Sequence, residues 1–331
     1  MAKGKILICL VVIILTFFLF DLFCFAAHLK KASFLPQWVP QAQFAGYYIA
    51  YEKGIYKKYG IDLTIIPGGP GRQSSDFLKN HKADFVTLWL ASGIQLRSRG
   101  IKLINIAQIV QRSALMFVAK KSKGILTPYD INGKKVGLWD SVFQIQPRAF
   151  FKKFNLKVKV VHQSYSVNLF LRDGVDVASA MWYNEYHTIL NSGINPDELS
   201  TFFFSKYGLN FPEDGIYTLE DFYKKDPNLS RSFVKASIEG WKYAFSHPKE
   251  ALSVVMKALS REHIPANMAH QKWMLDRMKD IIMPKDAQIP MGKLMVEDYN
   301  RVANILKEER LIKRIPDFSS FYKECIDHVL K

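Results

Sequence analysis

The chain has 331 residues, 49% of them hydrophobic, which at roughly 100–200 residues per domain predicts one large or two medium domains with a buried core. Its 18 glycines and 14 prolines are too few for a collagen-like or disordered chain. Its three cysteines exclude a disulfide framework and a zinc site built from several cysteines and histidines. The formal net charge is +16, but the lysines are dispersed without interleaved aromatic residues, which favours a solvated surface and predicts no nucleic-acid binding.

Residues 1–26 are laid out like a secretory leader. Lys3 and Lys5 precede an apolar run, and Cys24 and Ala26 supply the small side chains that precede a cleavage site. The apolar run is shorter than the ~20 residues that span a bilayer comfortably. We therefore predict an exported protein, periplasmic or at the outer face of the cytoplasmic membrane. The leader is then a signal peptide or, alternatively, an uncleaved N-terminal anchor.

After the leader, short apolar runs alternate with amphipathic ones up to about residue 110, and the same alternation restarts after Arg112. Strands that alternate with helices predict a parallel sheet, so we expect two α/β units in series. The predicted strands are 33–35, 61–66, 85–88, 103–110, 115–119, 135–138, 157–161, 175–180 and 201–204. The predicted helices between them are 44–51, 74–80, 91–99, 144–154, 167–173 and 184–192.

From Leu219 onward the pattern predicts helices only, over residues 229–246, 249–259, 265–278, 291–307 and 318–330. We therefore predict an α/β fold with two lobes around a hinge and a ligand cleft, followed by a helical C-terminal part. Lobe 1 would comprise residues 27–113 and 206–331, and lobe 2 residues 114–205. This organisation is typical of hinge-bending ligand binders.

A series of motifs then narrows the class. The quoted segments are 38–48 (WVPQAQFAGYY), 50–56 (AYEKGIY), 60–63 (GIDL), 68–71 (GGPG), 83–85 (ADF), 130–137 (DINGKKVG) and 181–186 (MWYNEY). In this order they resemble the substrate-binding proteins of ABC importers, in the branch related to the thiamine-pyrimidine synthase family. The resemblance covers about residues 32–260.

This resemblance implies a type II periplasmic-binding fold. It also implies a small heterocyclic ligand, such as a thiamine pyrimidine precursor or riboflavin, and an ABC permease and ATPase as partners. A sulfonate-like anion would belong to a more distant branch. We further expect no cofactor, no metal and a monomer that contacts the membrane only through its leader or the permease.

The synthases of the same branch are enzymes and form the competing interpretation. They use a histidine four residues after the proline of the Trp-x-Pro opening, where this chain has Phe44, and a cysteine cluster where residues 208–215 contain none. Phenylalanine has no ring nitrogen, and no thiol is present there for metal or redox chemistry. We therefore predict no catalytic residues and no enzyme. A membrane-tethered ligand sensor is the second alternative.

Candidate ligand contacts follow predicted strands, because ligands of open α/β sheets bind at the strands' carboxyl ends. Aromatic side chains there can stack on a flat ring. The alternative for each aromatic residue is packing in the interior of its lobe. The candidates of this kind are Trp38, Tyr47, Tyr48, Trp89 and Trp139, with Gln43 and Asp140 beside them.

Two further segments complete the predicted site. Gly69 and Gly71 lie in a loop that could offer backbone N–H groups to a ligand, although turn formation alone would also explain them. Trp182, Tyr183, Asn184 and Glu185 follow another strand, where Glu185 could accept hydrogen bonds from a ring N–H or amino group. The alternative is that Asn184 caps a helix and Glu185 complements its dipole. Of the histidines, only His162 lies near the predicted cleft.

Overall fold

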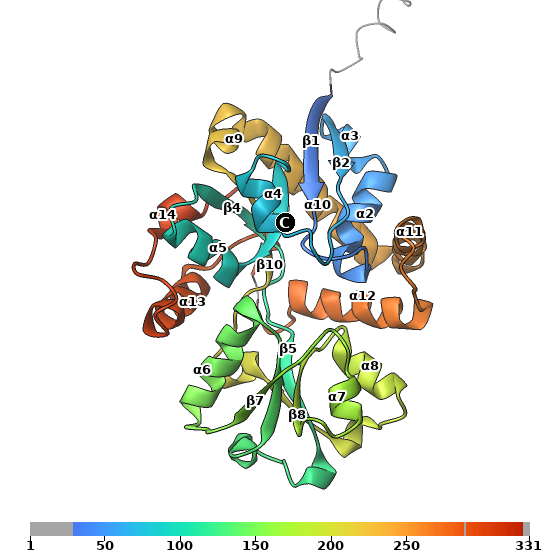
Figure 1. Cartoon of the computed structure of the whole chain (residues 1–331). Helices are drawn as coiled ribbons and strands as arrows, with labels where there is room; N and C mark the ends of the chain where they lie inside the picture. The colour runs from blue at the N-terminus through green and yellow to red at the C-terminus, as the bar shows by residue number, and fades with distance from the viewer. Residues whose placement is uncertain (1–28, 288, 327–331) are drawn as a thin grey trace, which may run out of the picture.

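The computed structural model describes residues 29–287 and 289–326, which form two sheets of five strands each, stacked along one long axis (Figure 1). The first sheet has the order β2-β1-β3-β10-β4 and the second the order β7-β6-β8-β5-β9. We call the first sheet with its helices lobe 1 and the second lobe 2. The predicted leader lies outside the described residues.

The strands of lobe 1 are β1 (Lys30–Leu35), β2 (Ile61–Ile65), β3 (Phe85–Trp89), β4 (Leu103–Gln108) and β10 (Asp214–Leu219). Those of lobe 2 are β5 (Leu115–Lys120), β6 (Lys135–Leu138), β7 (Lys159–His162), β8 (Val177–Met181) and β9 (Leu199–Phe203). Each predicted strand overlaps an observed one. The strand β10 was not predicted, because all six of its residues are buried and no alternation marks it.

Both sheets are mixed, so the predicted parallel pairing is right for only some of their ladders. The ladders β1–β2, β1–β3, β6–β7 and β6–β8 are parallel. However, β10 runs antiparallel to β3 and β4, and β5 runs antiparallel to β8 and β9. The physical reason is the route of the chain. The chain enters lobe 2 through β5 and returns to lobe 1 through β10. Each of these two strands lies between two others and runs antiparallel to both.

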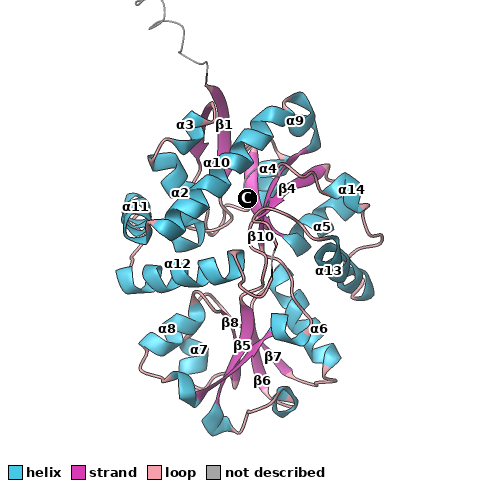
Figure 2. Cartoon of the chain, turned by 180° about the vertical axis from the view of Figure 1, so that it is seen from behind, coloured by secondary structure: helices cyan, strands magenta, loops and turns pink. Residues whose placement is uncertain are grey.

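Helices cover both sheets (Figures 1 and 2). Lobe 1 carries α2 (Ala45–Glu52), α3 (Ile55–Lys58), α4 (Ser74–Lys79), α5 (Leu90–Ser98), α9 (Glu220–Lys225), α10 (Pro227–Ser246), α11 (Pro248–Arg261), α12 (Met268–Ile282), α13 (Val296–Glu308) and α14 (Phe318–Phe321). Lobe 2 carries α6 (Ile145–Lys153), α7 (Asn168–Leu171) and α8 (Glu185–Asn191).

Of the last predicted helix, 318–330, only Phe318–Phe321 is helical among the described residues, and Tyr322 forms an extended bridge to Asn105. The predicted stretch 327–330 lies outside the described residues. Within the described residues, no helix combines the length and the apolar character needed to cross a membrane.

The core of lobe 1 forms where α10 crosses α2. A Cβ atom on Gly240 would lie 2.2 Å from the carbonyl oxygen of Gly46, so only glycine lets the two helices come this close. Phe233 of α10 stacks on Phe85 with ring centroids 4.1 Å apart and also contacts Phe34 at 5.2 Å. The rigid lobe therefore fixes the ends of β1 and β3, from which candidate site residues project. The predicted lobe boundaries at 113/114 and 205/206 remain a prediction.

Candidate functional site

Aromatic side chains from the two lobes meet at the ends of their strands. Trp38, which follows β1, has its ring centroid 4.9 Å from that of Tyr165, which follows β7. Trp89, at the end of β3, makes an edge contact at 4.7 Å with Phe143 of a short 3-10 helix in lobe 2. The same Phe143 contacts Trp139 at 5.9 Å. Trp38 and Trp89 of lobe 1 thus each contact a ring of lobe 2, and Trp139 shares the second of these contacts. The two partner rings, Tyr165 and Phe143, were not singled out from the sequence.

Trp139 is a buried candidate, whereas the candidate that follows it, Asp140, is exposed. Trp139 is buried, and its Nε1 donates to the carbonyl oxygen of Ser164 at 3.0 Å. Asp140 is exposed instead, and it faces Nδ1 of the exposed His162 at 3.2 Å. We therefore leave Asp140 and His162 out of the candidate site.

The glycine loop after β2 packs directly against the Trp38 segment. A Cβ atom on Gly68 would lie 2.0 Å from the carbonyl oxygen of Pro36 and 2.5 Å from that of Trp38. Gly69 is buried and has φ of +141°, whereas Gly71 is exposed with φ of +79°. The loop therefore supports the Trp38 backbone, and Gly71 lies outside the contact.

Replacing Gly68 by Ala is expected to destabilise the protein by about 3 kcal/mol, because the new methyl group meets only backbone atoms that cannot rotate away. Gly71→Ala is the matched control. It has open space around its Cβ position and should cost about 1 kcal/mol for its left-handed backbone alone. Urea unfolding of both variants checks the difference, and equal losses would contradict the close packing of the loop.

Three other predicted residues lie inside lobe 1. Tyr47 and Tyr48 are buried, and the ring of Tyr47 packs 4.7 Å from that of Phe34, so both occupy the interior of the lobe. Gln43 is also buried, and its amide nitrogen donates to Oδ2 of Asp214 at 2.8 Å. Gln43 therefore holds a carboxyl group that the sequence analysis missed.

Glu185 is the buried centre of the segment that follows β8. Its Oε2 accepts a hydrogen bond from the backbone N–H of Met181 at 2.9 Å, and its Oε1 accepts one from the Asn184 amide at 2.7 Å. Burial raises the pKa of Glu185 to about 7, although these hydrogen bonds act in the opposite direction. Asn184 does not cap α8 with its side chain, because that side chain binds Glu185.

Glu213 and Asp214 form a second buried acidic group at the start of β10. Burial raises the pKa of Asp214 to about 7. Burial, together with the charge of Asp214, raises that of Glu213 to about 8. The amides of Gln37 and Gln43 both donate to Asp214. An adjacent acidic pair between Pro212 and an apolar run was the sequence signal that could have identified them.

Tyr183 lies within electrostatic reach of both acidic groups. It is buried, and its pKa is raised well above the usual value, first by burial and then by the charges of Glu213, Asp214 and Glu185. The three carboxyl groups therefore act on one phenol at the junction of the lobes. Such a set can accept hydrogen bonds from ring N–H and amino groups.

Glu213 also ties together the two connections between the lobes, residues 109–114 and 204–213. Its Oε1 accepts from the backbone N–H of Ala114 at 2.6 Å and from the Ser113 hydroxyl at 3.2 Å. Asn210 accepts from the N–H of Ser113 at 2.9 Å. The acidic group thus lies at the connections between the two lobes.

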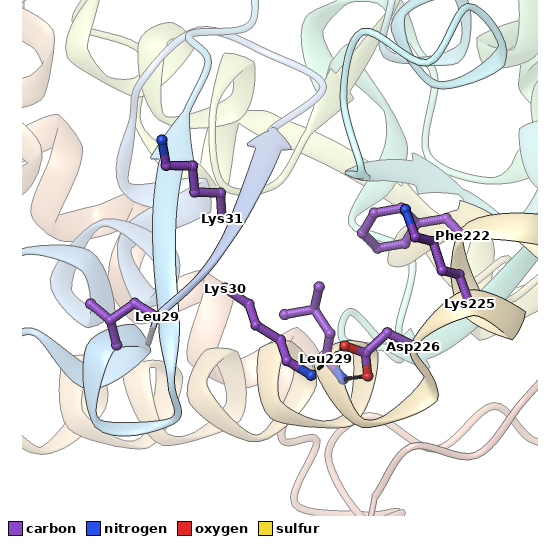
Figure 3. A pocket seen from close by; sticks show the side chains of 7 residues that line it. All are labelled: Leu29, Lys30, Lys31, Phe222, Lys225, Asp226 and Leu229. Atoms are coloured by element: carbon purple, nitrogen blue, oxygen red, sulfur yellow. Dashed lines mark hydrogen bonds and ion pairs between the residues drawn. The ribbon is translucent and has the colours of Figure 1, made fainter. Parts of the chain in front are cut away.

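A cavity of about 430 Å³ lies elsewhere, at the beginning of β1 (Figure 3). In it, Lys30 extends toward Asp226 at the start of α10, with which it forms an exposed ion pair. This cavity is at the amino end of β1, whereas Trp38 follows the carboxyl end. We therefore do not assign it to the candidate site at the lobe junction, where the side chains of both lobes are in contact. The remaining lining residues are Leu29, Lys31, Phe222, Lys225 and Leu229.

These two lobes, with strand ends facing each other across a hinge, define the periplasmic-binding-protein fold. The periplasmic aliphatic sulphonate binding protein SsuA of Escherichia coli has the same fold. It aligns with a TM-score of 0.69 over 88% of this chain and 91% of SsuA, at 14% sequence identity. The chain belongs to the NMT1/THI5-like family, which matches residues 41–251.

Two proteins that are similar to this chain in sequence have names that describe different functions. The riboflavin-binding protein RibY of Chloroflexus aurantiacus is 22% identical over 247 residues, which cover 69% of this chain and 66% of RibY. The 4-amino-5-hydroxymethyl-2-methylpyrimidine phosphate synthase THI5 of Saccharomyces cerevisiae is 22% identical over 128 residues, which cover 38% of each protein. The chain thus spans slightly less than two thirds of the first relative and much less of the second.

Proposed function

We propose that this protein is the exported, non-catalytic solute-binding protein of an ABC importer. Its two lobes close over a flat heterocycle, such as a thiamine pyrimidine precursor or riboflavin, and present it to a membrane permease with its ATPase. The predicted leader supports export. The mass of the mature protein distinguishes a cleaved signal peptide from a retained anchor.

The observation that carries this proposal is the combination of aromatic rings and buried carboxyl groups at the lobe junction. Trp38, Trp89 and Trp139 offer flat surfaces, and Glu185, Glu213 and Asp214 offer hydrogen-bond acceptors. Among the described residues no lysine or arginine side chain is buried. Buried acceptors without a buried cation beside them favour a ring that carries N–H donors over a sulfonate-like anion.

The synthase activity of one relative is the competing function. The Trp-x-Pro resemblance would require a histidine where this chain has Phe44, which lies fully buried in the core of lobe 1. The residues present therefore do not fit the chemistry of those enzymes. We expect no pyrimidine product when the protein is incubated with pyridoxal phosphate and iron.

A thermal-shift screen tests the ligand class. A ligand that binds only the folded protein stabilises it by RT ln(1 + [L]/Kd), which is ~2.7 kcal/mol at a hundredfold excess over Kd. We expect riboflavin or 4-amino-5-hydroxymethyl-2-methylpyrimidine to raise Tm by several degrees, and an alkanesulfonate to leave it unchanged. A shift with the sulfonate alone would contradict the proposed ligand.

A further inference from the structure

The helix α12 joins the two lobes. In both views it lies across the junction, between the body of lobe 1 and the helices of lobe 2 (Figures 1 and 2). It packs on α11 and on the 3-10 helix Ala42–Phe44 of lobe 1, and on its other side it contacts α8. The sequence predicted this helix but gave no reason to connect it with the site.

Trp273 of α12 binds the segment of lobe 2 that contains Glu185. Its Nε1 donates to the carbonyl oxygen of Trp182 at 3.0 Å, and its ring stacks on His187 with centroids 4.8 Å apart. The guanidinium group of Arg277, one turn further along α12, lies 4.8 Å from the Trp182 ring and 4.7 Å from the Trp273 ring. These contacts hold the start of α8 against lobe 1.

His270 extends the contact to the carboxyl group itself. Its Nε2 lies 2.9 Å from Oδ1 of Asn184. Because that oxygen only accepts, the bond assigns a proton to Nε2 of His270. The Asn184 amide nitrogen in turn donates to Glu185. A continuous chain of hydrogen bonds therefore runs from α12 to the proposed ligand contact.

The other nitrogen of His270 faces a second histidine across the junction. Nδ1 of His270 lies 2.9 Å from Nδ1 of His187. One proton between these two atoms forms a hydrogen bond, and the amide nitrogen of Asn191 lies 3.2 Å from the same Nδ1 of His187. Two protons would place two N–H groups and two charges head to head.

We propose that α12 is an arm of lobe 1 that holds the ligand-binding segment of lobe 2. In this arm His270 is a positioning residue for Glu185, and a second proton on the His187–His270 pair releases the contact. This inference rests on the proposed function, because it assigns regulation to the same site. Acidification would then open the cleft and weaken ligand retention.

Groups around the pair determine the direction of the pH effect. From α8, Tyr186 faces α12, with its ring centroid 6.2 Å from that of Trp273. From α12 itself Arg277 contributes a positive charge that is paired with Asp280 at 2.8 Å. Lys272 is paired with Asp276 at 2.9 Å on the exposed side. Burial lowers the pKa of both histidines, and His187 further lowers that of His270.

In an open form that exposes both histidines, their pKa returns toward the ordinary value of about 6.5, so that form binds more protons once the pH falls below it. If the open form binds one more proton than the closed form, the ratio of open to closed protein rises by up to about tenfold for each pH unit of acidification. The buried carboxyl groups of Glu185, Glu213 and Asp214 have raised pKa values and act in the opposite sense. Only a comparison with histidine variants therefore isolates the contribution of the pair.

Small-angle X-ray scattering of the purified protein, without added ligand, tests the proposal. We expect the radius of gyration to rise between pH 7.5 and pH 5.0 in the wild type. His270→Gln keeps a donor for Asn184 but cannot take up a proton, so it should stay compact at both pH values, as should His187→Gln. His270→Ala loses the donor and should be more open at both.

His247→Gln is the matched control, because His247 is exposed at the start of α11 and makes its hydrogen bonds to Ser246 and Tyr243. It should respond to pH like the wild type. An identical pH response in His270→Gln and the wild type would overturn the proposal, as would a response abolished by EDTA, which would assign the pair to a metal ion. Failure of the heterocycle screen would leave these outcomes unaffected, since the measurement uses no ligand.

Discussion

Glu185→Gln is expected to weaken binding of the heterocycle found in the thermal-shift screen by at least fivefold. The variant cannot accept the same hydrogen bonds, because one carboxyl oxygen becomes an amide donor that faces the Asn184 amide or the Met181 N–H. A ligand donor left unpaired in a closed cleft costs ~1–3 kcal/mol, or about five- to 150-fold in affinity. Isothermal titration calorimetry of variant and wild type measures the loss.

Asp197→Asn is the control for this substitution, because Asp197 is an exposed carboxylate of the same lobe. Its affinity should equal that of the wild type. Affinity of the wild type should also change less than threefold between low and high salt, since stacking and buried hydrogen bonds are screened weakly compared with exposed lysines. A steep salt dependence with an indifferent Glu185→Gln variant would instead indicate an anion held by lysines.

Features that depend on neighbouring residues were predictable from the sequence. Alternating apolar patterns gave the strands of both lobes, and the order of strand and helix placed Trp38, Trp89 and Trp139 at strand ends. The periplasmic-binding fold and the family then followed from the motifs and were confirmed. The ligand contacts themselves remain predictions.

Features that depend on distant residues were not predictable. The six buried residues of β10 show no alternation, and their antiparallel insertion is determined by two strands more than 100 residues earlier in the chain. Asp214 begins that strand and Glu213 directly precedes it, so the acidic group was missed together with it. The contact of His270 with Asn184 joins residues 86 positions apart, which no local pattern encodes.

Tyr47 and Glu185 show that two buried candidates can have different surroundings. Both lie in the helix that follows a strand, and both are buried. Tyr47 lies among the rings of Phe34 and Trp241, inside lobe 1. Glu185 contacts Asn184, which reaches α12 of the other lobe. The direction of a side chain at a strand end depends on the helix that follows, and single-sequence patterns do not fix it.

The second large effect concerns Glu213 and the pH dependence of stability. Its pKa is about 8 in the folded protein, against 4.5 for an exposed glutamate, mainly because burial disfavours the charged form. The folded state therefore binds more protons than the unfolded state between these values. Its contribution to stability is fully present below about pH 4.5 and is lost as the pH rises through about 8.

Glu213→Gln should remove this loss. Glutamine keeps an oxygen that accepts from the N–H of Ala114 and the hydroxyl of Ser113, but it carries no charge at any pH. Each unit of pKa difference corresponds to about 1.4 kcal/mol. The free energy of unfolding of the variant should therefore exceed that of the wild type by roughly 1–3 kcal/mol at pH 8 and equal it at pH 5.

Glu297→Gln, on the exposed start of α13, is the control and should change the free energy of unfolding equally little at both pH values. Urea unfolding at pH 5 and pH 8 measures the three proteins. A Glu213→Gln variant that is less stable than the wild type at pH 8 would show that the carboxylate is charged and well solvated, and the buried acidic group at the hinge would have to be abandoned.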